Sequence, residues 1–192
     1  MEQKERMDQG LIYDPADNRI STEQTSCLDA QYEFNATRPS EMKKRAALLK
    51  QMLGAIGENC YIEPPFRANW GGKHVYMGNN VYANFNLTVV DDGNIYIGDN
   101  VMFGPNVTIA TANHPILPEL REKGLQYNKD VHIGKNVWIG AGVVIVPGIM
   151  AKPDPDADYV DDDEDYGYDP EFEDDDEDRC CTLLVCTLSR SK

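Results

Sequence analysis

The stretch VHIGKNVWIGAGVVIVPGI, residues 131–149, places an aliphatic residue at every sixth position, at Val131, Val137, Val143 and Ile149. A step of six is not the period of an amphipathic helix, which repeats near 3.6 residues. It fits short flat strands that turn a corner every six residues, with the aliphatic side chain pointing inward. Three such units make one coil of about 18 residues, and stacked coils bury a continuous aliphatic column.

The same step occurs twice more upstream, at Val75 and Val81 and again at Ile95, Val101 and Val107. Glycines keep the same register, as in the pairs Gly98/Gly104 and Gly134/Gly140. Asn and small residues near the corners tolerate the positive φ that tight turns require. The sequence therefore predicts a mainly β chain built as a parallel β-helix over residues 59–150, in preference to an ordinary β-sandwich.

Two interruptions of the step indicate where residues leave the coil. Val81 and Val101 are 20 positions apart, two more than a coil, which makes Asp91-Asp92-Gly93 a short insertion. Val107 and Val137 are 30 positions apart, which we interpret as one coil plus 12 residues and as an extruded loop within 113–130. Such ejected segments are where solenoids place function.

The regions on either side of the repeat have different compositions. Residues 1–58 are expected to be a helical N-terminal segment on the acceptor side of the site, with one helix over Met42–Met52 and Ala46, Leu49 and Leu53 at helical spacing. Residues 151–192 carry 4 Lys and Arg against 16 Asp and Glu, a net charge of −12. We expect this acidic tail to be disordered, because it is too charged to bury a core.

Composition also excludes several functions. Residues 1–150 carry 14 Lys and Arg against 17 Asp and Glu, so no basic stripe is present to bind nucleic acid. No apolar run approaches the roughly 20 residues that span a bilayer. The five cysteines show no metal-ligand spacing, which predicts no metal site. The polar start has no secretory signal, so we expect a cytoplasmic protein.

His114 is the first candidate for chemistry, because it lies at the base of the expected loop, in Thr111-Ala-Asn-His-Pro115. A histidine needs little change in its pKa to accept a proton near neutral pH, which suits a general base. A turn histidine that simply precedes a proline is an equally good interpretation of its position.

Longer motifs add a resemblance. They are Tyr82-Ala-Asn84-Phe-Asn86-Leu-Thr-Val-Val-Asp91-Asp92, Asn113-His-Pro115, Val137-Trp138-Ile-Gly140, Tyr32-Glu-Phe-Asn35, Pro39-Ser-Glu41 and Glu63-Pro-Pro65. From about residue 10 to 149 the chain resembles the galactoside/maltose O-acetyltransferase family of hexapeptide-repeat enzymes, and most of all its galactoside (thiogalactoside) branch.

The resemblance implies a left-handed parallel β-helix that forms a homotrimer, with each active site between two subunits. It also implies transfer of an acetyl group from acetyl-CoA, as a cosubstrate, to a sugar hydroxyl. The reaction needs no metal, no permanently bound cofactor and no acyl-enzyme.

The resemblance assigns roles to seven residues of this chain. His114 matches the catalytic base. Asp14, Asn84 and Asp92 match residues that hold the sugar, and Tyr82 matches a neighbouring pocket wall. Trp138 matches a tryptophan near the thiol arm of CoA, and backbone N–H groups around Ala141 would face the oxyanion. Structural interpretations stay open for three of them: Asp92 in an ordinary turn, Asn84 at a solenoid corner and Trp138 as cover for a coil face.

The chain departs from the family in two places. Gln24 stands where the family has an arginine. After Ile149 the family continues with further repeat units and a basic segment that contact CoA, whereas here the stretch from Met150 to Pro155 is expected to end the repeat.

The tail has two explanations. It is either an acquired segment that binds a basic partner, or the product of a reading frame disrupted near residue 150. In the first case the partner contacts would be Tyr159, Tyr166, Tyr168 and Phe172.

Three functions follow from these features. The first is an acetyl-CoA-dependent sugar O-acetyltransferase. The second is a catalytically inactive relative that acts as a sugar-binding or interaction protein. The third is an acyltransferase of the same fold that acts on an amine or a serine.

Overall fold

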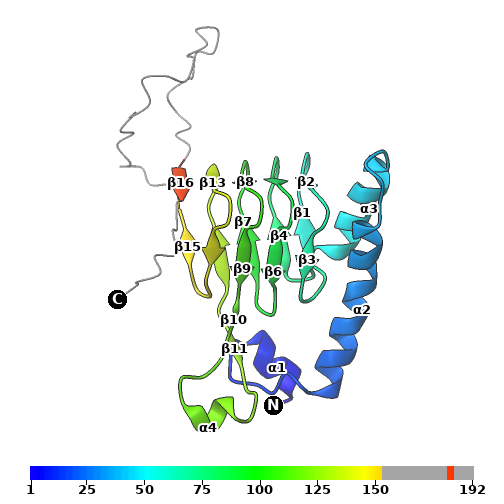
Figure 1. Cartoon of the computed structure of the whole chain (residues 1–192). Coiled ribbons are helices and arrows are strands. Elements are labelled where there is room, and N and C mark those ends of the chain that lie inside the picture. The colour runs from blue at the N-terminus through cyan, green and yellow to red at the C-terminus, as the bar shows by residue number, and fades with distance from the viewer. Residues whose placement is uncertain (153–180, 184–192) are drawn as a thin grey trace.

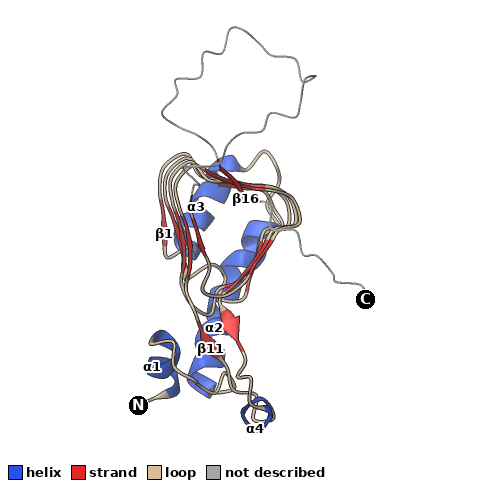
Figure 2. Ribbon diagram, turned by 90° about the vertical axis from the view of Figure 1, so that its left-hand side faces the viewer, coloured by secondary structure: helices blue, strands red, loops and turns tan. Residues whose placement is uncertain are grey.

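The computed structural model describes residues 1–152 and 181–183, and its central part is a parallel β-helix. Successive strands lie on three different faces before the chain returns to the first face one coil further on (Figure 1). Seen end-on, the coils have a triangular outline (Figure 2). The predicted hexapeptide-repeat solenoid is confirmed.

The three faces are parallel sheets, which we call face A, face B and face C. Face A contains β1 (Ala55–Ile56), β4 (Val75–Met77), β7 (Ile95–Ile97), β12 (Val131–Ile133) and β15 (Met150–Ala151). Face B contains β2 (Tyr61–Ile62), β5 (Tyr82–Ala83), β8 (Met102–Phe103), β13 (Val137–Ile139) and β16 (Cys181–Leu183). Face C contains β3 (Arg67–Ala68), β6 (Thr88–Val90), β9 (Thr108–Ala110) and β14 (Val144–Ile145).

The six-step aliphatic residues form the core, as predicted. Eight of them are at most 4% exposed: Val75, Val81, Ile95, Val101, Val107, Val131, Val137 and Val143. Burying such a side chain contributes about 1.5–3 kcal/mol. Ile149 differs, because it is 38% exposed. It belongs to the last described coil, where no further strand of face A covers it within the described residues.

Asparagines occupy the corners for the expected reason. Six of them have a φ between 55° and 62°: Asn59, Asn80, Asn86, Asn100, Asn106 and Asn136. The side chains also form ladders from coil to coil, in which the Asn80 Nδ2 donates to Asn100 Oδ1 at 3.0 Å and the Asn100 Nδ2 to Asn136 Oδ1 at 2.8 Å. Each corner therefore combines a left-handed backbone with a hydrogen bond to the next coil.

The register corrects the predicted size of the extruded loop. Tyr82 pairs with Met102, 20 positions on, which matches the short insertion at Asp91-Asp92-Gly93. Met102 pairs with Trp138, 36 positions on, which is two coils of 18. The insertion is therefore about a full coil, and the expected excess of 12 residues is wrong. The error arose because Val107 precedes face C whereas Val137 begins face B.

The inserted residues form a hairpin. Strands β10 (Ala112–Asn113) and β11 (Tyr127–Asn128) pair antiparallel, and the short helix α4 (Pro118–Arg121) lies at the tip. The hairpin follows β9 of face C and precedes β12 of face A, so it leaves the coil at the corner between these faces. Face B lies on the opposite side of the triangle (Figure 2).

Three helices precede the coil: α1 (Gln3–Asp8), α2 (Asn18–Asn35) and α3 (Met42–Met52). Helices α2 and α3 cover the end of the solenoid at β1 and β3, and α1 lies beside the hairpin. The predicted helix over Met42–Met52 is confirmed. Of the expected core positions Leu49 and Leu53 are buried, whereas Ala46 is exposed and the neighbouring Arg45 is 5% exposed. Arg45 is tolerated there because its Nε donates to Thr37 Oγ1 at 2.9 Å and Glu63 lies 4.0 Å away.

The repeat continues past the expected stop. Strand β15 pairs in parallel with β12, and Ala151 is 3% exposed. Strand β16, from the expected disordered tail, pairs with β13. The rest of the tail, with Tyr159, Tyr166, Tyr168 and Phe172, lies outside the described residues. Among the helices of the described residues, none has the length and apolar character needed to cross a membrane.

Candidate active site

His114 lies on the hairpin, directly after β10, and its side chain is exposed. Its Nδ1 is 2.9 Å from the carbonyl oxygen of Leu125 on the opposite arm. A carbonyl oxygen can only accept, so this contact requires the hydrogen of a neutral imidazole to be on Nδ1. The Nε2 atom then carries the lone pair, which is the state that a general base needs.

Tyr13 fastens the N-terminal segment to this hairpin. Its backbone N–H donates to the Gln126 carbonyl at 2.9 Å, and the Gln126 N–H donates back to the Tyr13 carbonyl at 3.1 Å. The Tyr13 hydroxyl accepts from the side-chain amides of Gln126 and Asn128. Burial, followed by the charge of Asp92, raises the pKa of Tyr13 to about 12. The hydroxyl therefore stays protonated and neutral in this contact.

The two aspartates of the short insertion are buried and bonded, which a solvent-exposed turn would not require. Asp91 is fully buried and accepts from the backbone N–H groups of Trp70 at 2.7 Å and Gly72 at 3.1 Å. Burial raises the pKa of its carboxyl, against the lowering effect of the Trp70 N–H. Asp91 thus fixes the chain just before β4.

Asp92 is 8% exposed and accepts from three neutral donors. These are the Asn69 Nδ2 at 2.9 Å, the Gln126 Nε2 at 3.2 Å and the Trp70 Nε1 at 3.4 Å. The first inserted segment is therefore joined to the hairpin through Asp92.

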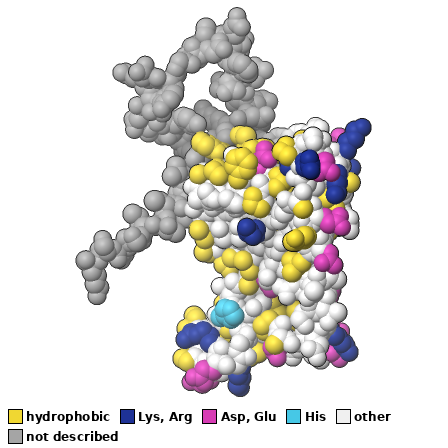
Figure 3. Space-filling model, turned by 45° about the vertical axis from the view of Figure 1, so that its right-hand side comes forward, with side chains coloured by type: hydrophobic (Ala, Val, Ile, Leu, Met, Phe, Trp, Pro, Cys, Tyr) yellow, Lys and Arg dark blue, Asp and Glu magenta, His cyan; other side chains and the backbone are white. Residues whose placement is uncertain are grey.

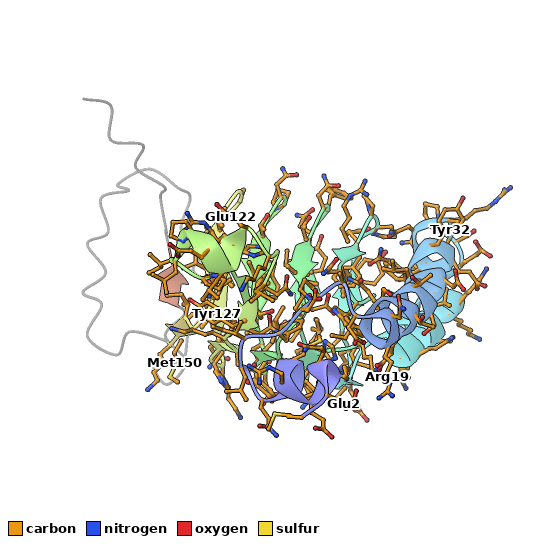
Figure 4. All side chains as sticks on the ribbon, turned by 90° about the horizontal axis from the view of Figure 1, so that it is seen from below. Glu2, Arg19, Tyr32, Glu122, Tyr127 and Met150 are labelled. Carbon is orange, nitrogen blue, oxygen red and sulfur yellow. The ribbon has the colours of Figure 1, made fainter. Side chains whose placement is uncertain are left out.

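Asp14 belongs to the same neighbourhood because it directly follows Tyr13. It is half-buried, and its Oδ1 accepts from the Ala16 N–H at 2.9 Å. Its own N–H donates to the Gln3 Oε1 of α1 at 2.8 Å. Helix α1 is also tied to the start of α2, since Arg19 and Glu2 form an ion pair of 3.1 Å (Figure 4). Asp14 through its neighbour Tyr13, Asp92 and His114 are thus each connected to the 125–126 arm of the hairpin, and we call them the hairpin group.

A second group lies on face B. Tyr82, Met102 and Trp138 are opposite one another on adjacent strands and form an outward row, with exposed fractions of 37%, 48% and 45%. Tyr82 also stacks on Tyr61, with ring centroids 6.4 Å apart. In the space-filling view, hydrophobic side chains gather on the upper part of the molecule (Figure 3). Trp138 therefore belongs to an exposed row of apolar side chains.

Asn84 and Ala141 lie at the corner that follows face B. The Asn84 Oδ1 accepts from the Phe85 N–H at 2.8 Å, which directs the amide nitrogen elsewhere. Ala141 is exposed, and a Cβ added to Gly104 of the preceding coil would come within 2.6 Å of the Ala141 nitrogen. The glycine allows the two coils to approach closely at this corner.

The seven candidate residues therefore fall into two groups. Asp14, Asp92 and His114 belong to the hairpin group, whereas the others lie on or next to face B. The hairpin leaves from the corner opposite face B, so one chain does not bring the groups together. A site that uses both needs a hairpin from one copy and face B from another.

Tyr13, Trp70, Gln126 and Asn128 are structural partners that sequence reasoning did not select. Their contacts join positions as much as 115 residues apart, and no repeat or spacing relates them. Within residues 1–152, no cluster of three His, Cys, Asp or Glu side chains is arranged to hold a metal ion.

Comparison with known families gives a consistent picture. The family model described as the maltose acetyltransferase hexapeptide capping motif matches residues 6–57. The chain is 50% identical over 149 residues to the galactoside O-acetyltransferase of Lactococcus lactis, which covers 78% of this chain and 72% of the relative. It is also 50% identical over 118 residues to the galactoside O-acetyltransferase of Escherichia coli, which covers 62% of this chain and 58% of that relative.

Solved structures agree in both fold and sequence. A galactoside acetyltransferase in complex with coenzyme A superposes with a TM-score of 0.74 at 42% identity, over 78% of this chain and 74% of the other. A maltose O-acetyltransferase from Clostridium difficile gives 0.76 at 41% identity, over 78% of this chain and 80% of the other. The parallel β-helix described above is the left-handed kind found in these structures.

Proposed function

The chain belongs to the galactoside and maltose O-acetyltransferase family of acyltransferases, and we propose that it transfers an acetyl group from acetyl-CoA to a sugar hydroxyl. The observation that carries this proposal is His114, whose Nδ1–H is held by the Leu125 carbonyl at 2.9 Å so that Nε2 faces outward as a base.

We assign the proton transfer to His114. Its Nε2 takes the proton of the sugar hydroxyl while the hydroxyl oxygen attacks the thioester carbonyl. The resulting tetrahedral intermediate collapses by breaking the C–S bond, and the departing thiolate takes the proton back from Nε2. The products are the acetylated sugar and CoA, and His114 returns to its starting state without an acyl-enzyme.

The donor for the developing oxyanion is the N–H of Ala141. The next N–H, of Gly142, is already used, because it donates to the Pro105 carbonyl at 2.9 Å. The Asn84 Nδ2 at the same corner is a donor for the sugar, since the Oδ1 of the same amide is held by the Phe85 N–H. Fixed donors of this kind stabilise the transition state most. Trp138 and Tyr82 form an apolar wall for the thiol arm of CoA and for the acceptor.

We propose a homotrimer as the active form. The hairpin group and the face B group lie on opposite sides of one chain, so each site would be completed by a neighbouring copy. The exposed row of Tyr82, Met102 and Trp138 supports this arrangement, because an exposed apolar row is stabilised when a neighbour covers it. A closed ring of identical contacts gives each site the same two groups.

A sugar-binding protein without transferase activity is the second candidate. It is favoured by the end of the repeat, because face C has four strands in the described residues whereas faces A and B have five. In the family the following coils contact CoA. The cytoplasmic location and a basic partner for the acidic tail stay predictions from the sequence.

Calorimetric titration of acetyl-CoA into the full chain separates the two candidates. A Kd below about 1 mM, roughly −4 kcal/mol, together with acetylation of a galactoside or maltose, supports the transferase. The His114→Ala variant should then bind acetyl-CoA equally well and lose the transfer step. Sugar binding without any heat from acetyl-CoA in folded protein would contradict the transferase and support the second candidate.

A further inference from the structure

A cavity of about 240 Å³ lies at the corner from which the hairpin leaves, and we call it the corner cavity. A water molecule occupies about 30 Å³ in the liquid, so this space is larger than a single water needs. The lining side chains come from α1, from the segment around β4 and β7, and from the hairpin. The polar lining residues are Tyr76, with its hydroxyl, and Asp8, His74, Asp92, Asn94, Asn128 and Asp130.

Asn128 is the unusual residue of this cavity, because it is 94% buried and only the nitrogen of its side-chain amide forms hydrogen bonds. Its Nδ2 donates to the Asp92 carbonyl at 2.9 Å and to the Tyr13 hydroxyl at 3.4 Å. Its Oδ1 is buried and has no hydrogen-bond partner in the described residues. An unpaired buried acceptor costs about 1–3 kcal/mol, so the arrangement calls for a donor from outside the chain.

The rest of the lining is also rich in acceptors. The His74 Nδ1 is 2.6 Å from the Asp91 carbonyl and must donate to it, which leaves Nε2 as an acceptor in the neutral ring. The Asp130 carboxylate accepts from the N–H of Asn94 at 2.9 Å and from its Nδ2 at 3.3 Å. Each carboxylate oxygen can accept a further bond.

The charge of the cavity is not compensated by the chain. Asp8 forms an ion pair with Lys4. In the described residues no ion pair involves Asp92 or Asp130, and the donors to both are neutral amides, backbone N–H groups and an indole. No Lys or Arg is among the lining residues. A ligand with several N–H donors and a positive charge would supply both the missing hydrogen-bond donor and the missing positive charge.

We propose that the corner cavity binds the ammonium group of a small organic cation, such as an amino sugar. A metal ion does not fit as well, since the carboxylates of the described residues do not form a metal-binding cluster. An ammonium group offers three donors, and the lining supplies acceptors for them in Asn128 Oδ1, His74 Nε2 and the Asp130 carboxylate.

The test compares glucosamine with glucose by calorimetric titration into the full chain, without acetyl-CoA. The two sugars differ in the ammonium group, so the proposal predicts that glucosamine binds at least tenfold more tightly. Equal affinities, or no heat from glucosamine, would overturn it and indicate a cavity that holds only water. Because no acetyl transfer is measured, this result is independent of whether the proposed transferase activity exists.

Two variants locate the binding. Asp130→Asn removes one charge from the cavity and should weaken glucosamine at least tenfold. Asp29→Asn removes the same charge from the exposed side of α2 and should leave the affinity unchanged. An equal loss in both variants would show that the net acidity of the chain attracts the amine, and would overturn the proposal. If Asp130→Asn does not fold, Asn128→Ser supplies the same comparison, with weaker glucosamine binding expected.

Discussion

Replacing Asn100 by alanine tests the physical basis of the coil corners. Asn100 has a φ of 58° and belongs to the ladder, where it accepts from Asn80 at 3.0 Å and donates to Asn136 at 2.8 Å. Alanine in the left-handed region costs about 1–2 kcal/mol. Losing two hydrogen bonds of about 0.5–1.5 kcal/mol each brings the expected destabilisation to about 2–5 kcal/mol. This is a large share of the 5–15 kcal/mol typical of a domain.

The matched variant is Asn100→Gly, which loses the same hydrogen bonds without the left-handed penalty. Glycine retains more backbone entropy in the unfolded chain, so the net advantage of Gly over Ala should be about 1 kcal/mol. Asn18→Ala, on the exposed start of α2, should change stability by less than about 0.5 kcal/mol. The assay is unfolding in guanidinium chloride. An Ala variant as stable as the Gly variant would refute the explanation from backbone conformation.

Three further predictions concern the site and its support. Burial raises the pKa of Asp91, so the folded state holds this proton more tightly than the unfolded state. The free energy of unfolding of the wild type, relative to that of Asp91→Asn, should therefore fall as the pH rises above about 4. A difference between the two proteins that does not change with pH in denaturant unfolding would contradict this. Tyr13→Phe removes a hydroxyl that accepts from two side-chain amides, and it should lower the free energy of unfolding by about 1–3 kcal/mol. An unchanged free energy of unfolding would show that the amides find other partners. Trp138→Ala truncates a side chain of the face B row, so the KM for acetyl-CoA should rise, and an unchanged KM would remove Trp138 from the CoA surface.

The repeat made the β-helix predictable. A six-residue step such as Val131, Val137 and Val143 can bury every marked side chain only if the chain turns at each unit. The corner asparagines were predictable for a related reason, because Asn tolerates a positive φ. Both rules are local, because each depends only on residues a few positions apart in the sequence.

Other features depended on contacts that no local rule contains. Arg45 is buried instead of Ala46 because Thr37 and Glu63 satisfy its guanidinium from other segments. The size of the loop was mistaken because Val107, the third position of its coil, was compared with Val137, the second position of the next. Strand β15 was missed because the inward position after Ile149 holds Ala151 where β12 has Ile133, although the backbone still pairs with β12.

The candidate site was predictable only in part. The position of His114 beside an insertion pointed to it, but its hydrogen bond to Leu125 depends on how the hairpin closes. Asp92 was expected to hold a sugar, and its three neutral donors were not foreseen. The separation of the hairpin group from face B follows from the triangular cross-section of the coil. The resemblance had implied only that the site lies between subunits.

The most direct test of a shared active site is complementation between two inactive variants. His114→Ala lacks the base on the hairpin, and Asn84→Ala lacks the donor next to face B, so neither should acetylate a galactoside alone. When the two are unfolded together, mixed in equal amounts and refolded, random assembly into trimers should give about a quarter of the sites both intact groups. We predict recovery of about a quarter of the wild-type rate; no recovery from a mixture that forms trimers and binds acetyl-CoA would contradict the shared site.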